Sequence, residues 1–231
     1  MSDRKGISRR TVIKGALAGA ATGIAGFPFI SYGQSDVIRI GHLTPRTGFL
    51  GPLGEFAVQA VDMAVAEINA AGGINGRKIE LLKEDSVNPQ TASTKAERMI
   101  ERDKVACIIG EISSASALTI GQVAERTHTL FINTGANSDQ LRGKSCSKYM
   151  FHIESQNSMY VKTCGRALTA QGLVKGKKWF SLTADYAFGH DLLRVAKKSV
   201  ASVGTSLSAA NSPPAAAMNR FETRSRSWPN A

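Results

Sequence analysis

The stretch from Val37 to Leu43 reads VIRIGHL, and this mostly apolar, β-branched run decides the fold. Such a run is typical of a strand that is buried on both faces. Leu53–Ala70 follows, with apolar residues at the three- and four-residue spacing of a helix. The segment from Ala71 to Gly76 then ends the helix, because glycine and asparagine tolerate the left-handed backbone of a C-cap. We therefore expect a strand followed by a helix.

The alternation of strand and helix continues along the chain. Asn88 is expected to cap the next helix, with Pro89 at its first position. The further strands expected are Lys78–Asp85, Val105–Gly110, Thr129–Asn133, Tyr149–Ile153 and Trp179–Thr183, and the further helices are Pro89–Asp103, Ser113–Arg126, Met159–Gly172 and Asp191–Val203. This order predicts an α/β fold with a parallel sheet covered by helices on both faces.

The N-terminal segment has the features of an export signal. Arg9 and Arg10 precede a weakly apolar run of glycine and alanine, a pattern that resembles a twin-arginine signal. A transmembrane helix is the alternative, but the uncharged run from Gly15 to Tyr32 is barely long enough and contains Pro28. We therefore expect residues 1–34 to be a twin-arginine signal segment, and the exported protein to be periplasmic without a stable membrane span.

The formal net charge of +11 raises the question of nucleic-acid binding. Residues 1–34 carry a net +4 and residues 205–231 a net +2, which leaves +5 for the middle of the chain. There, lysine and arginine are scattered among aspartate and glutamate, without a basic stripe interleaved with aromatic residues. We therefore expect no nucleic-acid partner.

The sequence contains no motif that indicates catalysis, a metal or a cofactor. No phosphate-binding loop, dinucleotide fingerprint or nucleophile elbow occurs where a strand meets a helix. The four histidines lack the spacing that places two metal ligands on one helix face; they are His42, His128, His152 and His190. We expect no catalytic residue, no metal site and no cofactor, and hence a protein that is not an enzyme.

The three cysteines leave their pairing open. Cys107 lies in an apolar strand and is most simply a buried small side chain. Cys146 and Cys164 either form a disulfide in the periplasm or remain free.

The alternation stops near Thr205. Residues 205–231 are rich in serine, alanine and proline, a composition that predicts disorder. One interpretation is an ordinary flexible terminus. The other is a frameshift or premature stop, because a doubly wound lobe that ends after two strands cannot cover its sheet.

Four segments, taken in order, resemble the periplasmic leucine/isoleucine/valine-binding protein family. They are Ile40–Gly48, Ala66–Ile79, Ile109–Ser114 and Asp185–Gly189. The resemblance extends from Val37 to Val203 and implies a type I periplasmic-binding-protein fold. It implies a doubly wound first lobe over residues 35–150 and an incomplete second α/β lobe that starts with residues 151–204. In this family the two lobes close about a hinge over a small solute.

The resemblance also implies a ligand site between the lobes. In the family, loops at the carboxyl ends of strands hold the carboxylate and ammonium groups of an amino acid through a serine and backbone groups. The positions that correspond are Ser113, Ser114, Gly135, Ala136, Asn137 and Leu53 in the first lobe, and Tyr186 and Phe188 in the second. Asn137 and Leu53 depart from the threonine and the aromatic residue that are usual there. Tyr186 and Phe188 have an alternative role in the core of the second lobe.

The resemblance thus predicts the substrate-binding component of an ABC importer for amino acids or related small amides and carboxylates. Its expected partners are the small-molecule ligand and an inner-membrane ABC permease. Two alternatives remain open: a periplasmic ligand sensor that presents its closed state to a receptor kinase, and a nonfunctional truncated fragment.

Overall fold

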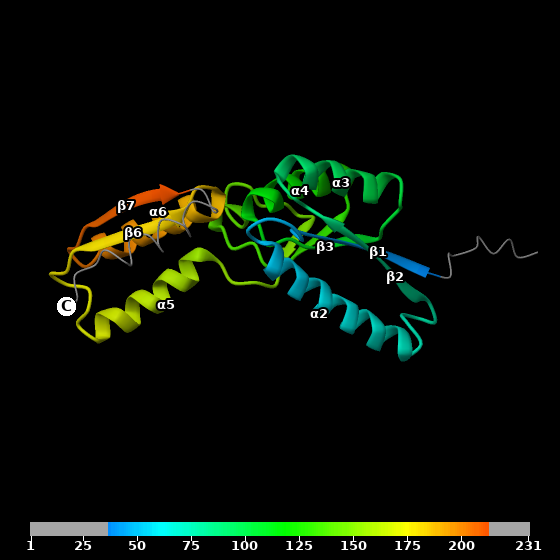
Figure 1. Cartoon of the computed structure of the whole chain (residues 1–231), viewed down its shortest axis with the longest axis horizontal. Helices are drawn as coiled ribbons and strands as arrows, with labels where there is room; N and C mark the ends of the chain where they lie inside the picture. Colours follow the sequence, from blue (N-terminus) through cyan, green and yellow to red (C-terminus); the bar gives the residue numbers. More distant parts are fainter. Residues whose placement is uncertain (1–36, 213–231) are drawn as a thin grey trace, which may run out of the picture. The chain divides into compact units, whose positions relative to one another are not determined.

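A computed structural model describes residues 37–212 (Figure 1). The predicted signal segment and the end of the predicted tail, residues 213–231, lie outside the described residues. The strands are β1 (Val37–Thr44), β2 (Lys78–Asp85), β3 (Cys107–Gly110), β4 (Leu130–Asn133), β5 (Met150–His152), β6 (Trp179–Ala184) and β7 (Leu207–Ser212). The helices are α2 (Gly51–Ala70), α3 (Pro89–Glu101), α4 (Ser114–Thr127), α5 (Asn157–Ala170) and α6 (Ala187–Ala201), with a 3₁₀ turn at Asp139–Leu141.

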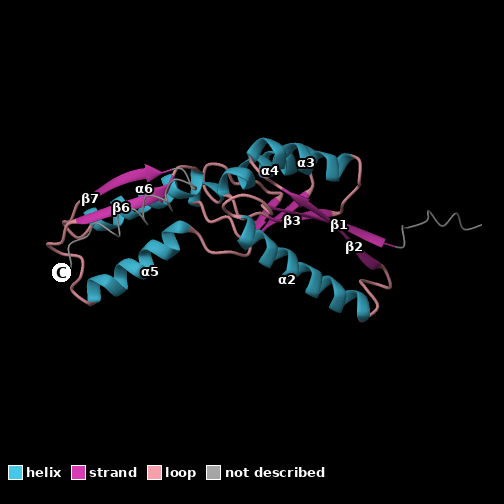
Figure 2. Cartoon of the chain, in the orientation of Figure 1, coloured by secondary structure: helices cyan, strands magenta, loops and turns pink. Residues whose placement is uncertain are grey.

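The first five strands form one parallel sheet in the order β2-β1-β3-β4-β5. Helices α3 and α4 cover one face of this sheet and α2 lies against the other (Figure 2). The predicted α/β class is therefore confirmed. Because β1 lies inside the sheet, its second half, residues 41–44, is buried between β2 and β3.

The main core lies between the sheet and the helices α3 and α4. Leu43, Ile108 and Phe131 come from three neighbouring strands and pack against Met99 of α3 and Ile120 of α4. All five side chains are buried, and burial of each stabilises the fold by roughly 2 kcal/mol. This packing fixes the carboxyl ends of β1, β3 and β4 beside one another.

The predicted cap of α3 is confirmed. The side chain of Asn88 accepts a hydrogen bond of 2.9 Å from the N–H of Thr91, and Pro89 occupies the first helical position. This cap satisfies one of the N–H groups that have no acceptor within the helix. It also fixes the short loop between β2 and α3.

Residues 207–212 form a strand where the sequence predicted a structureless tail. Strand β7 pairs in parallel with β6 along its whole length, from Leu207 beside Trp179 to Ser212 beside Ala184. The expectation of disorder from residue 205 is wrong for this segment. Its serine and alanine residues have weak strand propensity of their own, and pairing with β6 and packing against α6 outweigh that propensity.

Other features of the described residues bear on the earlier expectations. Helices α5 and α6 begin before the predicted Met159 and Asp191, at Asn157 and Ala187.

The thiols of Cys107, Cys146 and Cys164 are free, so the structure does not contain the Cys146–Cys164 disulfide. Within residues 37–212, no helix combines the length and apolar character needed to cross a membrane.

A glycine sets how closely α2 approaches the loop after β1. A Cβ atom added to Gly54 would lie 1.6 Å from the carbonyl oxygen of Pro45. Only glycine fits there without movement of the backbone. The loop that follows β1 is thereby held against the first turn of α2.

Replacing Gly54 by alanine is expected to destabilise the protein by about 2 kcal/mol or more, because the Pro45 backbone must move. Gly165→Ala in α5 is the matched control: its new Cβ would meet only the Ser199 hydroxyl, at 3.2 Å, and that side chain can rotate. This control should be as stable as the parent or up to about 1 kcal/mol more stable. Chemical denaturation of both variants measures the difference, and equal stabilities would contradict the close approach.

Candidate functional site

A pocket of about 320 Å³ lies at the carboxyl ends of the first three strands. The loop after β1, the loop after β2 and the first turn of α4 form its walls, together with Tyr186. The residues that line it include Thr47, Phe49, Leu50, Ser86, Val87, Asn88, Ser113, Ala115 and Tyr186. Crevices at the carboxyl ends of parallel strands are where α/β proteins commonly bind ligands.

A larger hollow of about 890 Å³ lies between α5, α6 and β6. Its lining is mainly apolar and includes Leu168, Trp179, Leu182 and Val200. Part of this surface belongs to the two-stranded sheet of β6 and β7, which lacks the close cover that α3 and α4 give the first sheet. Because α/β proteins commonly bind ligands at the carboxyl ends of parallel strands, we assign the candidate site to the smaller pocket there.

The first turn of α4 supplies polar groups to the pocket. The side chain of Ser113 caps the helix by accepting a hydrogen bond of 3.4 Å from the N–H of Ser116. The N–H of Ala115, which also lines the pocket, belongs to the same turn and has no acceptor within the helix. An anion in the pocket could accept a hydrogen bond from it, since the positive end of the helix dipole lies there.

Glu111 lies between β3 and α4, in a backbone conformation with φ of +74°. Its side chain is fully buried, and Oε1 accepts hydrogen bonds from the N–H groups of Ile112 (2.9 Å) and Ser113 (2.7 Å). Left-handed backbone is unusual for a residue other than glycine and is retained where the surroundings enforce it. Here the carboxyl group itself stabilises the turn that leads into α4.

The other carboxyl oxygen of Glu111 is less well satisfied. Oε2 is buried and has no hydrogen-bond partner of good geometry within residues 37–212. The same holds for two hydroxyl groups at the ends of the neighbouring strands, those of Thr44 and Ser86. Parallel pairing of β1 with β2 and β3 brings the strand ends that carry these three residues to the same edge of the sheet, where Ser86 lines the pocket.

Burial raises the pKa of Glu111 to about 7, although hydrogen bonds from Ser113, Ser86 and Ile112 oppose this change. The negative charge of Asp85 raises it further. Glu111 therefore changes charge near neutral pH. A carboxyl group beneath a pocket with this property is a candidate for a functional role.

Asp85 holds the two loops of the pocket together. Oδ1 accepts hydrogen bonds from the N–H groups of Arg46 (2.9 Å) and Val87 (3.0 Å), and Oδ2 accepts one from the hydroxyl of Thr47 (2.6 Å). Burial acts to raise the pKa of Asp85, but these hydrogen bonds outweigh burial and lower it. An ionised Asp85 thus fixes the loops after β1 and β2 against each other.

Tyr186 is the residue of the second α/β unit that reaches the pocket. It is the N-cap residue of α6, and its ring centroid lies 6.0 Å from that of Phe188. Burial raises the pKa of its hydroxyl, and the charge of Glu111 raises it further. Tyr186 therefore stays un-ionised at physiological pH and offers a hydroxyl group and an apolar ring.

The buried Asp191 links α6 to the segment after β4. Its Oδ2 accepts hydrogen bonds from the backbone N–H of Asp139 (2.7 Å) and from the side chain of Asn157 (2.9 Å), and Oδ1 pairs with Arg194. Burial acts to raise the pKa of Asp191, but these hydrogen bonds outweigh burial and lower it. Asp191 thus orients the helix that begins beside Tyr186.

The structure brings two of the residues predicted for the site, Ser113 and Tyr186, to the pocket. Ser114 is fully buried, and its hydroxyl accepts a hydrogen bond of 3.2 Å from the N–H of Ser138. Gly135 and Ala136 lie in a turn held by the Asn133 side chain, which binds both the N–H and the carbonyl of the buried Ala136.

The other three predicted residues lie away from the pocket lining. The side chain of Asn137 donates a hydrogen bond of 2.8 Å to the carbonyl of Ser155. Phe188 does not line the pocket, but its ring packs against that of Tyr186, which does. Leu53 is 54% exposed on α2, and the loop before it contributes Phe49 and Leu50 to the pocket.

Sequence reasoning missed several groups at the site. Ser86, Val87 and Asn88 lie in the loop between β2 and α3, and Glu111 lies in the loop between β3 and α4. Their position at the ends of adjacent parallel strands was the available signal, because all such ends meet at one edge of the sheet.

Comparison with known proteins identifies the family. The model of a family described as periplasmic binding protein matches residues 37–220. The chain belongs to this family. The match agrees with the expectation of a binding protein rather than an enzyme.

Individual relatives in this family resemble the same region. An amino acid binding protein of Pseudomonas aeruginosa is 32% identical over 171 residues, which are 74% of this chain and 42% of that protein. Leu/Ile/Val-binding protein homolog 8 of Brucella abortus is 34% identical over 135 residues, 58% of this chain and 33% of that protein. The crystal structure of a periplasmic binding protein of Burkholderia mallei has a TM-score of 0.71 at 33% identity and covers 77% of this chain and 47% of that one. The chain thus spans less than half the length of these relatives.

Replacing Glu111 by glutamine should change how stability depends on pH. The folded state holds the pKa of Glu111 at about 7, above its ordinary value of 4.5, so stability is lost as pH rises from about 4.5 to 7. Glutamine keeps the oxygen that accepts from Ile112 and Ser113 but cannot ionise. At pH 8, Glu111→Gln should be more stable than the parent by up to about 3 kcal/mol.

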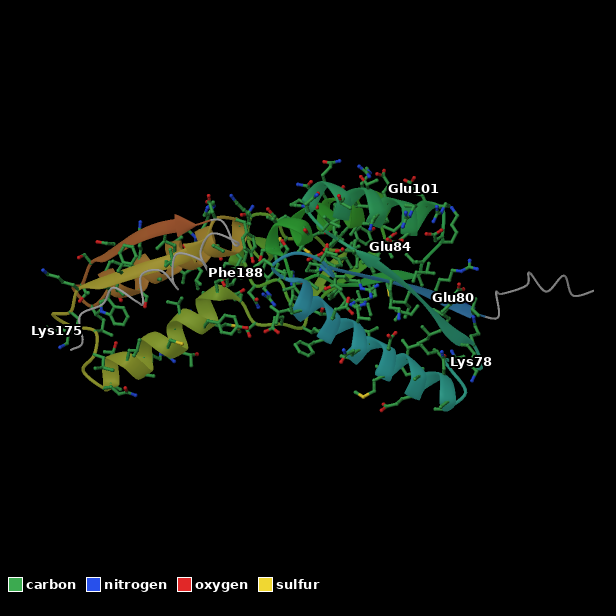
Figure 3. The ribbon with its side chains drawn as sticks, in the orientation of Figure 1. Lys78, Glu80, Glu84, Glu101, Lys175 and Phe188 are labelled. Atoms are coloured by element: carbon green, nitrogen blue, oxygen red, sulfur yellow. The ribbon has the colours of Figure 1, made fainter. Side chains whose placement is uncertain are left out.

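Urea denaturation at pH 5 and pH 8 measures this effect. Glu101→Gln is the matched control, because Glu101 is exposed at the end of α3 (Figure 3). If the free energy of unfolding of Glu111→Gln decreased from pH 5 to pH 8 as much as that of the parent, the raised pKa of Glu111 would be contradicted.

Proposed function

We propose that this chain provides a solute-binding site of an ABC importer for amino acids or related small amides and carboxylates. The observation that carries the proposal is the pocket at the carboxyl ends of β1, β2 and β3, which the first turn of α4 enters. No charged side chain of the described residues lines this pocket. A carboxylate in it would be held by backbone N–H groups and hydroxyls rather than by a basic side chain.

The pocket has two chemically distinct sides. Ser113 and the N–H groups at the start of α4 form a polar side that suits a carboxylate. Phe49, Leu50 and Val87 form an apolar side, and Tyr186 brings a ring from the second α/β unit. A volume of about 320 Å³ suits a small solute. The names of the relatives in P. aeruginosa and B. abortus support an amino acid as the first class to test.

The proposal includes a location and a partner. The family supports an extracytoplasmic protein, and Arg9 and Arg10 support export by the twin-arginine route. The partner would be an inner-membrane permease that accepts the solute after the two α/β units close over it. Tyr186 is the described residue of the second unit that would then contact the solute.

Thermal-shift measurements on the full chain test the proposal. L-leucine and 4-methylpentanoate should raise the melting temperature, because a solute that binds only the folded state stabilises it. Isoamylamine, which lacks a carboxylate, should not. No change in melting temperature with any carboxylate or amide of a broad panel, including benzoate, would contradict the proposal.

The Ser113→Ala variant tests the polar side of the pocket. Loss of the hydroxyl should weaken binding of L-leucine about tenfold in calorimetry, since a hydrogen bond to a charged group is lost. Ser202→Ala, at an exposed serine after α6, is the matched control and should bind as the parent does. Because Ser113 also caps α4, both variants are measured well below their melting temperatures. Unchanged affinity of Ser113→Ala would exclude a role for its hydroxyl.

A further inference from the structure

The buried carboxyl group of Glu111 shares its hydrogen-bond donors with the place where a ligand carboxylate would bind. Its Oε1 accepts from the N–H of Ser113, the residue whose side chain caps α4 and lines the pocket. A ligand carboxylate on the N–H of Ala115, which lines the pocket, would lie at the same helix start as the Ser113 N–H that donates to Glu111. Two carboxyl groups this close cannot both be ionised without strong repulsion.

Among the described residues, no lysine or arginine forms an ion pair with Glu111, although Lys95 of α3 lies at the end of β2, where its Nζ donates a hydrogen bond of 2.8 Å to the carbonyl of Asp85. The titratable groups that face it are Asp85 at the end of β2, Tyr186 at the start of α6 and His42 of β1. Asp85 is negative and Tyr186 is uncharged. The ring of His42 lies against Gly110, and burial lowers its pKa to about 4, so it is neutral above pH 5. Ser86 contributes only a hydroxyl.

The second carboxyl oxygen of Glu111 is compatible with either charge state. Oε2 is buried, and the nearby hydroxyl of Ser86 can donate a hydrogen bond to a carboxylate or accept one from a carboxylic acid. Glu111 can therefore take the acid form without losing this contact when another anion lies close by.

We propose that Glu111 is a specificity-determining residue of this site. Glu111 must be uncharged for an anionic carboxylate to occupy the start of α4. When Glu111 is ionised, the pocket therefore takes up such a ligand together with one proton. The proton comes from solvent and neutralises the Glu111 carboxylate as the ligand binds. The inference rests on the proposed function. It adds that the pocket prefers anionic ligands below neutral pH and loses this preference above it, while uncharged ligands of the same shape are unaffected.

Calorimetric titration of the full chain at pH 6 and pH 8.5 tests the inference. 4-Methylpentanoate is the anionic probe, L-leucine is the zwitterionic probe, and 4-methylpentanamide is the uncharged probe of the same shape. In the parent, the dissociation constant of 4-methylpentanoate should be on the order of tenfold higher at pH 8.5 than at pH 6. That of the amide should stay constant, and L-leucine should show a smaller change in the same direction because its ammonium group offsets part of the repulsion.

Two variants and one further measurement make the test specific. In Glu111→Gln the dissociation constant of 4-methylpentanoate should be the same at both pH values, whereas Glu101→Gln should behave as the parent does. Titrations near pH 7.5 in buffers of different ionisation enthalpy should show uptake of about half a proton per 4-methylpentanoate in the parent. This measurement needs no variant.

The outcomes separate the inference from the function on which it rests. Binding of the carboxylates with equal affinity at both pH values, or without proton uptake, overturns the role of Glu111 and leaves the proposed function intact. A pH dependence that persists in Glu111→Gln also overturns it. Absence of binding by all three probes at both pH values overturns the proposed function and the inference together.

Discussion

Parallel pairing of β1 with its two neighbours is the constraint on which the rest of the molecule depends. In a parallel sheet every strand ends at the same edge, so the loops that follow β1, β2 and β3 must lie together. The second half of β1, residues 41–44, is buried in the middle of this arrangement. Four features of the molecule lie at this one edge of the sheet: the pocket, the first turn of α4, and the carboxyl groups of Asp85 and Glu111.

The two acidic residues at this edge have opposite environments. Asp85 accepts three hydrogen bonds and is held in its ionised form, so that it fixes the walls of the pocket. Glu111 accepts two through one oxygen, and its other oxygen is buried without a partner of good geometry among the described residues. The carboxylate of Asp85 therefore has a structural role. The protonation state of Glu111, in contrast, can change when another charge lies nearby. Placing such a group in left-handed backbone costs stability, a cost that proteins accept mainly at functional sites.

The sequence predicted those parts of the fold that depend on local pattern. Strand Lys78–Asp85 has the predicted bounds, and Asn88 caps α3 as expected, because both follow from hydrophobic spacing and capping chemistry. Strand β7 was missed because its serine and alanine residues form a strand only through pairing with β6. At the site, Ser113 was predicted from the family resemblance, and the structure places it in the pocket lining. Leu53 was expected in the pocket but lies on α2, since the path of a loop depends on contacts such as that of Gly54 with Pro45. Glu111 could not be assigned, because its burial depends on three strands that are distant in sequence.

The central claim is that a carboxylate binds at the first turn of α4, within this pocket. A crystal structure of the chain with 4-methylpentanoate bound at pH 6 would test it most directly. The account predicts that the ligand carboxylate lies within hydrogen-bond distance of the N–H of Ala115 and of the Ser113 hydroxyl, with its alkyl chain against Phe49 and Leu50. A ligand found instead in the apolar hollow between α5, α6 and β6, with the first turn of α4 unoccupied, would contradict it.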